Sequence, residues 1–145
     1  MSGFFGVIIL IDCDNQPVSQ SNRLFNAIQQ KIGIVSCAFL VGNSHGEHVK
    51  TWGLNTRKKF PSAIIDITVA TNRKESADAN LIMKMAYVKA LFSIDSVCCI
   101  VVTEDNQIIA AAEILADDNL KEKRRVYITN LRNGNVKTSL PLLNC

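Results

Sequence analysis

Three aspartates stand where predicted strands end or a predicted helix begins. Asp12 follows the apolar run FFGVIILI, Asp105 follows the run VCCIVV after two intervening residues, and Asp78 lies near the start of ESADANLIMKM. Hard cations such as Mg²⁺ take oxygen ligands, and carboxylates from separate segments that meet at one edge of a sheet can supply them. The positions of these acids therefore indicate a divalent-metal site.

Hydrophobic patterning predicts the elements that would position these acids. Continuous apolar runs of strand length predict strands at 4–11, 34–41, 63–70, 97–102 and 126–131. Apolar residues at helical spacing predict helices at 17–33, at 76–92 and through 108–116, and Asn133-Gly134 predicts a turn that starts a small hairpin. No element is predicted between residues 42 and 62, which have loop residues followed by a basic stretch.

Alternating strands and helices predict one α/β domain spanning residues 1–145. Because each predicted strand is apolar throughout, we expect a three-layer α/β/α sandwich with a mainly parallel central sheet. In such sheets the ligand lies beyond the carboxyl ends of the strands, near the point where the strand order reverses. Asp12 and Asp105 follow strands, so both should project from that edge.

Composition limits the cellular setting and the partners. The five cysteines include no CxxC spacing, and free thiols in a reducing compartment are the simplest interpretation of that pattern. The chain begins without a basic leader and contains no apolar run long enough to cross a bilayer, so we expect a cytoplasmic protein without membrane contact. A net charge of +3 permits nucleic-acid binding.

Three motifs together resemble a known family. The strings LIDCDNQ, SADANL and IVVTEDN occur in the order seen in the NYN branch of the PIN-like nuclease superfamily, and the resemblance extends from Phe4 to about Val126. It implies a PIN-like, Rossmann-like fold and a ribonuclease that depends on Mg²⁺ or Mn²⁺. It also implies that Asp12, Asp78 and Asp105 are the catalytic and metal-binding acids.

The resemblance assigns supporting roles and includes one departure. Asn15 would orient the site, and Thr103 would shape the loop beside the third acid. Many relatives have another aspartate where this chain has Gln107. Glu104 or Asp14 would then supply the missing carboxylate.

Basic residues and one aromatic residue are candidates for contact with single-stranded or structured RNA. Lys and Arg side chains contribute most of nucleic-acid affinity through phosphate contacts, and aromatic rings stack on unpaired bases. The candidates are Arg73 and Lys74, Arg57, Lys58 and Lys59, and Trp52. A partly buried strand aromatic is an equally good interpretation of Trp52.

Other interpretations remain open from the sequence alone. With Gln107 at the expected acidic position, a PIN-like fold without catalysis would serve as an RNA-binding or protein-interaction module, and a homodimer or a protein partner is open for either function. The pair Asp12-x-Asp14 after an apolar strand is also reminiscent of haloacid-dehalogenase phosphatases, which use such acids as nucleophile and acid/base. A zinc site at His45 and His48 is disfavoured, because no cysteine pair has ligand spacing.

Overall fold

The computed structural model describes residues 6–43, 45–71, 76–91, 97–116 and 125–145. Within these ranges strands and helices alternate along the chain, as the hydrophobic patterning predicted. The elements are β1 (Gly6–Asp12), the 3₁₀ helix η1 (Val18–Gln20), α1 (Ser21–Lys31), β2 (Val35–Gly42), α2 (Glu47–Lys59), β3 (Ile64–Val69), α3 (Ser76–Leu91), β4 (Val97–Val102), α4 (Asn106–Ala116) and β5 (Arg125–Thr129).

The described strands form one sheet in the order β3-β2-β1-β4-β5, and every neighbouring pair is parallel. The chain builds outward from β1 to β3, then returns to place β4 on the other side of β1. The carboxyl ends of β1 and β4 therefore adjoin at the point where the strand order reverses, which is where open α/β sheets bind ligands. Ile11 lies beside Val102 in this pairing.

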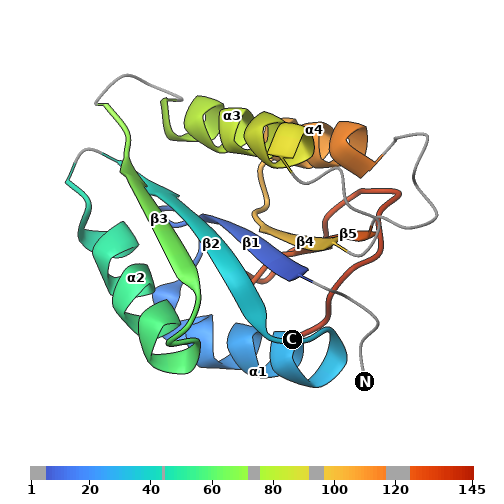
Figure 1. Ribbon diagram of the computed structural model, residues 1–145. Helices are drawn as coiled ribbons and strands as arrows, with labels where there is room; N and C mark the ends of the chain where they lie inside the picture. The colour runs from blue at the N-terminus through green and yellow to red at the C-terminus, as the bar shows by residue number, and fades with distance from the viewer. Residues whose placement is uncertain (1–5, 44, 72–75, 92–96, 117–124) are drawn as a thin grey trace.

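Helices cover both faces of the sheet, so the predicted three-layer sandwich is confirmed (Figure 1). Successive strand side chains point to opposite faces. Ile9 of β1 packs with Leu24 of α1 and with α2, whereas Leu10 packs with Leu81 of α3 and with α4. Burial on both sides explains why β1 and β4 are apolar at nearly every position.

Helix α2 was missed by the sequence-based prediction. Its buried face consists of Val49, Trp52, Gly53 and Thr56, at helical spacing. Only two of these residues are large and apolar, and glycine and threonine have low helix propensity, so the periodicity is weak. The helix is stabilised by packing against the sheet and by basic residues in its last turn, which complement the helix dipole.

The hairpin predicted at Asn133-Gly134 is wrong. The described residues after β5 contain no further strand of regular length, and only Leu142 forms a parallel bridge with Ile128 of β5. Leu131 and Leu143 are buried in the core on the α1 side. The segment after β5 therefore returns as an irregular cover over the sheet, because its two buried leucines gain more from the core than a solvent-exposed hairpin would provide.

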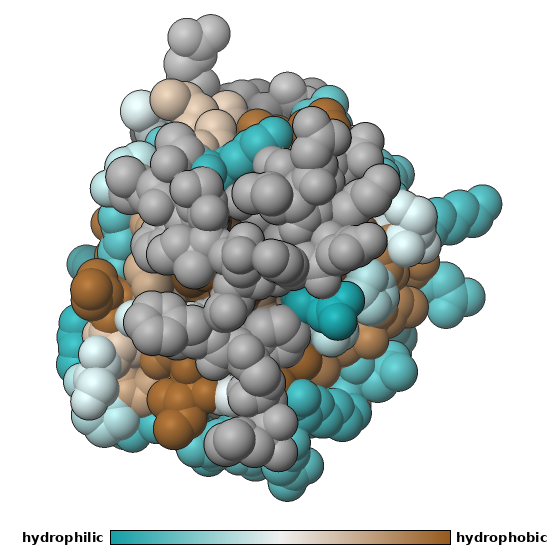
Figure 2. Space-filling model, turned by 45° about the vertical axis from the view of Figure 1, so that its right-hand side comes forward, coloured by the Kyte–Doolittle hydropathy of each residue, from teal (hydrophilic) through white to brown (hydrophobic). Residues whose placement is uncertain are grey.

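The described surface mixes apolar and polar side chains. Figure 2 shows brown and teal residues interleaved around the face that it presents. Ile34, Met83 and Ile114 are among the exposed large apolar residues. No helix in the described part of the chain combines the length and apolarity needed to cross a bilayer.

Candidate functional site

Asp12 ends β1 as a buried carboxylate that is 2 % exposed. The chain turns immediately afterwards, with the Asn15 backbone N–H donating to the Asp12 carbonyl over 3.3 Å. This turn brings the Asn15 Nδ2 amide to 3.1 Å from Asp12 Oδ1 and 3.2 Å from Oδ2. From the neighbouring strand end, Thr103 Oγ1 donates to Asp12 Oδ2 over 3.2 Å. Both oxygens are thereby held in place.

The electrostatic setting of Asp12 links it to the other two predicted acids. Burial is the largest cause of a pKa raised to about 6, and the negative charges of Asp78 and Asp105 raise it further. Hydrogen bonds from Asn15 and Thr103 oppose these effects by stabilising the ionised form. The charges of Asp78 and Asp105 are therefore close enough to influence the Asp12 carboxyl.

Asp105 begins α4 as its N-terminal cap. Its Oδ1 accepts hydrogen bonds from the backbone N–H groups of Gln107 over 2.8 Å and Ile108 over 3.1 Å. Its own N–H donates to Thr103 Oγ1 over 3.1 Å. The Thr103 hydroxyl thus bridges the two acids, donating to one and accepting from the backbone of the other. Because both capping bonds reach Oδ1, Oδ2 can face a ligand.

A cavity of about 310 Å³ opens at this edge, and we call it the acidic cavity. Its lining residues carry only carboxylate and amide side chains: Asp12, Asn15, Glu104, Asp105 and Asn106. Glu104 also forms an ion pair with Arg132 over 3.3 Å. Glu104 thus lines the cavity together with the carboxylates of Asp12 and Asp105.

Two other candidates lie outside the lining of this cavity. An oxygen of Asp14 lies 3.3 Å from the position that a Cβ would occupy on Gly42, at the end of β2. Gln107, at the expected acidic position, is an exposed residue in the first turn of α4. Of the two candidates for the missing carboxylate, Glu104 lines the cavity and Asp14 does not.

The three predicted ligands are near one another but are not assembled into a ready-made metal-ligand group. In the described ranges of the chain, no three His, Cys, Asp or Glu side chains lie close enough together to hold a metal ion. Asp78 is half-buried in the first turn of α3, from where its charge reaches Asp12. The cavity itself holds Asp12 and Asp105.

The predicted base-stacking role of Trp52 is wrong. Its side chain is 0 % exposed, its ring packs edge-on against Phe25, and its Nε1 donates to the Gln16 carbonyl over 3.4 Å. Trp52 is a core residue of α2, although its neighbours in the sequence are mostly polar or basic. It is not a strand residue either.

The predicted RNA-binding basic residues that the structure describes, Arg57, Lys58 and Lys59, lie away from the acidic cavity. Arg57, Lys58 and Lys59 form the last turn of α2, and Lys59 Nζ donates to Asn26 Oδ1 over 2.8 Å. Since α2 connects two parallel strands, it runs from the carboxyl edge of the sheet to the amino edge (Figure 1). These residues therefore lie at the opposite end of the fold. Arg73 and Lys74 lie outside the described residues.

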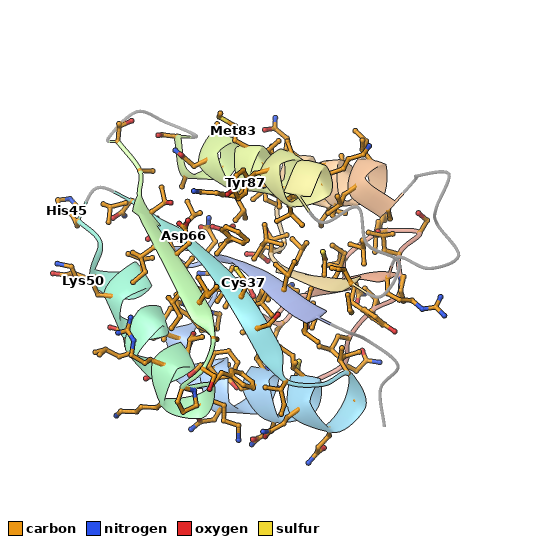
Figure 3. The ribbon with its side chains drawn as sticks, viewed as in Figure 1. Cys37, His45, Lys50, Asp66, Met83 and Tyr87 are labelled. Atoms are coloured by element: carbon orange, nitrogen blue, oxygen red, sulfur yellow. The ribbon has the colours of Figure 1, made fainter. Side chains whose placement is uncertain are left out.

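Among the residues that the structure describes, neither histidine belongs to a group of three metal-ligating side chains. His45 lies in the loop before α2 and projects outward at the margin of the molecule (Figure 3). His48 is exposed in the first turn of α2, rather than in a loop as the sequence suggested.

Sequence reasoning missed a buried amide beside the acidic cavity. Gln16 is 3 % exposed; its Nε2 donates to Asn130 Oδ1 over 3.0 Å, and its Oε1 accepts from the Leu131 N–H over 2.8 Å. It ties the turn after β1 to the segment after β5. The sequence around Gln16 contains no pattern that predicts a hydrogen bond to a residue more than a hundred positions away. This linking role of Gln16 therefore becomes visible only in the structure.

Comparison with known proteins supports the fold of this chain. No family model matches the chain, and no curated protein matches it. It is similar to the crystal structure of a protein of unknown function from Vibrio parahaemolyticus, with a TM-score of 0.56 and 13% sequence identity. That similarity covers 90% of this chain and 83% of the other. The relationship supports the three-layer architecture.

Proposed function

We propose that this chain is a metal-dependent endoribonuclease that hydrolyses RNA phosphodiester bonds at the acidic cavity. The observation that carries the proposal is the Asp12 carboxylate, buried where the strand order reverses and surrounded by the charges of Asp78 and Asp105. Burying a carboxylate near like charges is costly unless something compensates, and a bound cation would do so. The motif resemblance to NYN and PIN-like nucleases agrees with this chemistry.

The donor atoms of the cavity fit Mg²⁺ or Mn²⁺. The lining side chains offer only oxygen ligands of carboxylate and amide type. Mg²⁺ is usually held by one or two protein carboxylates and keeps several waters for substrate phosphates. Asp12 and Asp105 would therefore hold the ion. The negative charge of Asp78 would add to the attraction for the cation, and Glu104 would lie beside it in the cavity lining.

The protein side chains would prepare this site before substrate arrives. Asn15 and Thr103 fix the two oxygens of Asp12, and Thr103 also positions the backbone of Asp105. A divalent cation bound there would polarise the phosphodiester and lower the pKa of the attacking water. Pre-positioned ligands need no rearrangement as charge develops, which favours the reaction.

The proposed location is the cytoplasm. All five cysteines are free thiols. Cys98 and Cys99 lie in the two separate cores on opposite faces of β4 and serve as packing residues. Free, buried thiols suit a reducing compartment.

A second candidate is a PIN-like module that binds RNA or protein without cleavage. Two observations favour it: the described residues provide no group of three metal-ligating side chains, and Asp105 is engaged in capping α4. The phosphatase alternative has less support, because Asp14 does not line the acidic cavity with Asp12.

Cleavage of a fluorescent single-stranded RNA, with Mn²⁺, with Mg²⁺ and with excess chelator, tests the proposal. Asp12→Asn and Asp105→Asn should each lower the metal-dependent rate by roughly 100-fold or more, since the cation contributes several kcal/mol. Asp66→Asn is the matched control, because Asp66 lies on β3 at the far edge of the sheet and pairs with Lys84 (Figure 3). Undiminished cleavage in both site variants would overturn the proposal. RNA binding without cleavage by the parent would favour the second candidate, and a phospho-enzyme burst would favour the phosphatase.

A further inference from the structure

A second cavity, of about 420 Å³, opens where β5 ends, and we call it the β5 pocket. Its volume lies within the roughly 300–1,000 Å³ typical of ligand pockets. Two arginines and four asparagines are among its lining residues. The lining residues are Arg23, Ile128, Thr129, Asn130, Arg132, Asn133, Gly134, Asn135, Val136, Leu142, Leu143, Asn144 and Cys145.

The walls of this pocket are anchored to the fold. The Ile128 N–H donates to the Pro141 carbonyl over 3.1 Å, and the Leu143 N–H donates to the Ile128 carbonyl over 2.9 Å. Leu143 is buried in the core with Leu131. The returning C-terminal segment therefore continues the sheet locally and gives the pocket a fixed floor.

The two arginines enter the pocket from different elements. Arg23 belongs to α1, and its Nη2 donates to the Leu131 carbonyl over 3.3 Å. Arg132 follows β5, and its backbone N–H donates to Asn130 Oδ1 over 3.1 Å. Both arginines are exposed residues, and a guanidinium group carries five N–H donors, so donors remain for a ligand beside the bond to Leu131 and the ion pair with Glu104.

The β5 pocket and the acidic cavity have no lining residue in common, but two contacts link their linings. Arg132, which lines the pocket, pairs over 3.3 Å with Glu104, which lines the cavity. Gln16 follows Asn15 of the cavity and bonds to Asn130 of the pocket. The pocket and the cavity are therefore close neighbours, at a spacing set by these two contacts.

The lining chemistry suits an anionic strand with exposed base edges. Arg23 and Arg132 are the charged side chains of the lining, and no aspartate or glutamate side chain is among the described residues that form it. Arginine binds phosphate oxygens through a planar fork of donors. Asparagine amides hydrogen-bond to base edges, which unpaired RNA leaves accessible.

We infer that the β5 pocket binds a phosphate and an adjoining base of a single-stranded RNA whose neighbouring phosphodiester lies in the acidic cavity. This inference rests on the proposed function for the position of the scissile bond. The two arginines of the pocket, rather than the basic residues in the last turn of α2, then provide affinity for the RNA backbone.

Binding of a short fluorescent single-stranded RNA, followed by anisotropy in excess chelator over a series of salt concentrations, tests this inference without cleavage. Arg23→Ala and Arg132→Ala should each weaken binding about fivefold or more and reduce the slope of log affinity against log salt by about 0.7. Arg57→Ala removes the same charge at the far end of α2 and should leave affinity within about twofold. Thermal unfolding should show that all three variants fold.

Glu104→Ala separates RNA contact from the structural ion pair. This variant breaks the pair with Arg132, keeps the arginine and removes a negative charge beside the proposed phosphodiester, so RNA binding in excess chelator should become tighter. If Glu104→Ala loses as much RNA affinity as Arg132→Ala, the inference is overturned. It is also overturned if Arg23→Ala and Arg132→Ala bind RNA as well as Arg57→Ala does, or if the parent binds no RNA. Arginine-dependent binding without any cleavage would leave the inference standing and remove the nuclease. If the parent cleaves RNA but the two arginine variants bind RNA normally, the proposed nuclease stands and this inference is contradicted.

Discussion

Thr103 Oγ1 donates a hydrogen bond to Asp12 Oδ2 over 3.2 Å, although the two residues are 91 positions apart in the chain. The same hydroxyl oxygen accepts the Asp105 N–H over 3.1 Å. One buried side chain therefore connects the ends of β1 and β4 across the point where the strand order reverses. The relative position of the two proposed metal ligands depends on it.

Thr103→Val should damage both stability and metal binding. Valine has a similar shape, but it removes a donor from the buried Asp12 carboxylate and the acceptor of the Asp105 N–H. Leaving such groups without partners costs about 1–3 kcal/mol of unfolding free energy. Loss of a group that orients a ligand should also weaken Mn²⁺ binding by about 10-fold or more. Urea unfolding and calorimetry measure the two effects.

Thr103→Ser is the matched control for this prediction, because serine retains the hydroxyl and loses only a methyl group. It should keep most of the Mn²⁺ affinity of the parent. If valine and serine variants bind Mn²⁺ equally well, the bridging role of Thr103 is contradicted.

The raised pKa of Asp12 predicts a pH-dependent cost to folding in metal-free buffer. The folded state holds the Asp12 proton up to about pH 6, whereas an unperturbed aspartate carboxyl has a pKa of 3.8. Between these values the folded state binds more protons, so its stability should fall as the pH rises from 3.8 through 6 and then level off. The full cost is about 3 kcal/mol by linkage, as an upper bound.

Asp12→Asn removes this titration and should reverse its effect. The free energy of unfolding of the variant, relative to the parent, should increase between about pH 4 and pH 7 in excess chelator, by up to about 3 kcal/mol. Urea unfolding at both pH values gives this difference. If the free energies of unfolding of the two proteins change with pH in parallel, then folding does not raise the pKa of Asp12.

The fluorescence of Trp52 should report on the packing of the core and should not respond to RNA binding. It is the single tryptophan of the chain, and its side chain is fully buried. Its emission should therefore resist quenching by iodide and stay unchanged when RNA is added. Trp52→Ala should lower the free energy of unfolding by about 3–5 kcal/mol, whereas Trp52→Phe should cost less and preserve RNA binding. Strong quenching by RNA would restore the base-stacking hypothesis.

The fold was predictable where a single physical signal dominated. Strands buried on both faces must be apolar at nearly every position, so β1 and β4 could be located from FFGVIILI and VCCIVV alone. Parallel strands bring their carboxyl ends to one edge, so the meeting of Asp12 with Asp105 at one cavity followed from their places after those strands.

What could not be predicted depends on weak periodicity or on distant partners. Helix α2 buries Gly53 and Thr56 on its packed face, which hides its periodicity and led to the wrong role for Trp52. Arg57 to Lys59 were adjacent to that tryptophan in sequence, yet the direction of the helix places them at the opposite edge of the sheet. The bond between Gln16 and Asn130 joins residues that share no local pattern.

Titration of the protein with Mn²⁺ by calorimetry, compared between the parent, Asp12→Asn and the control Asp66→Asn, tests the central claim most directly. The account predicts saturable binding to the parent and to the control, with at least about 10-fold weaker binding to Asp12→Asn. Near pH 6 the parent should also release protons on binding, seen as an enthalpy that depends on the buffer, because the Asp12 carboxyl must ionise. No binding to the parent, or equal binding to all three proteins, would contradict the claim that Asp12 anchors a divalent cation.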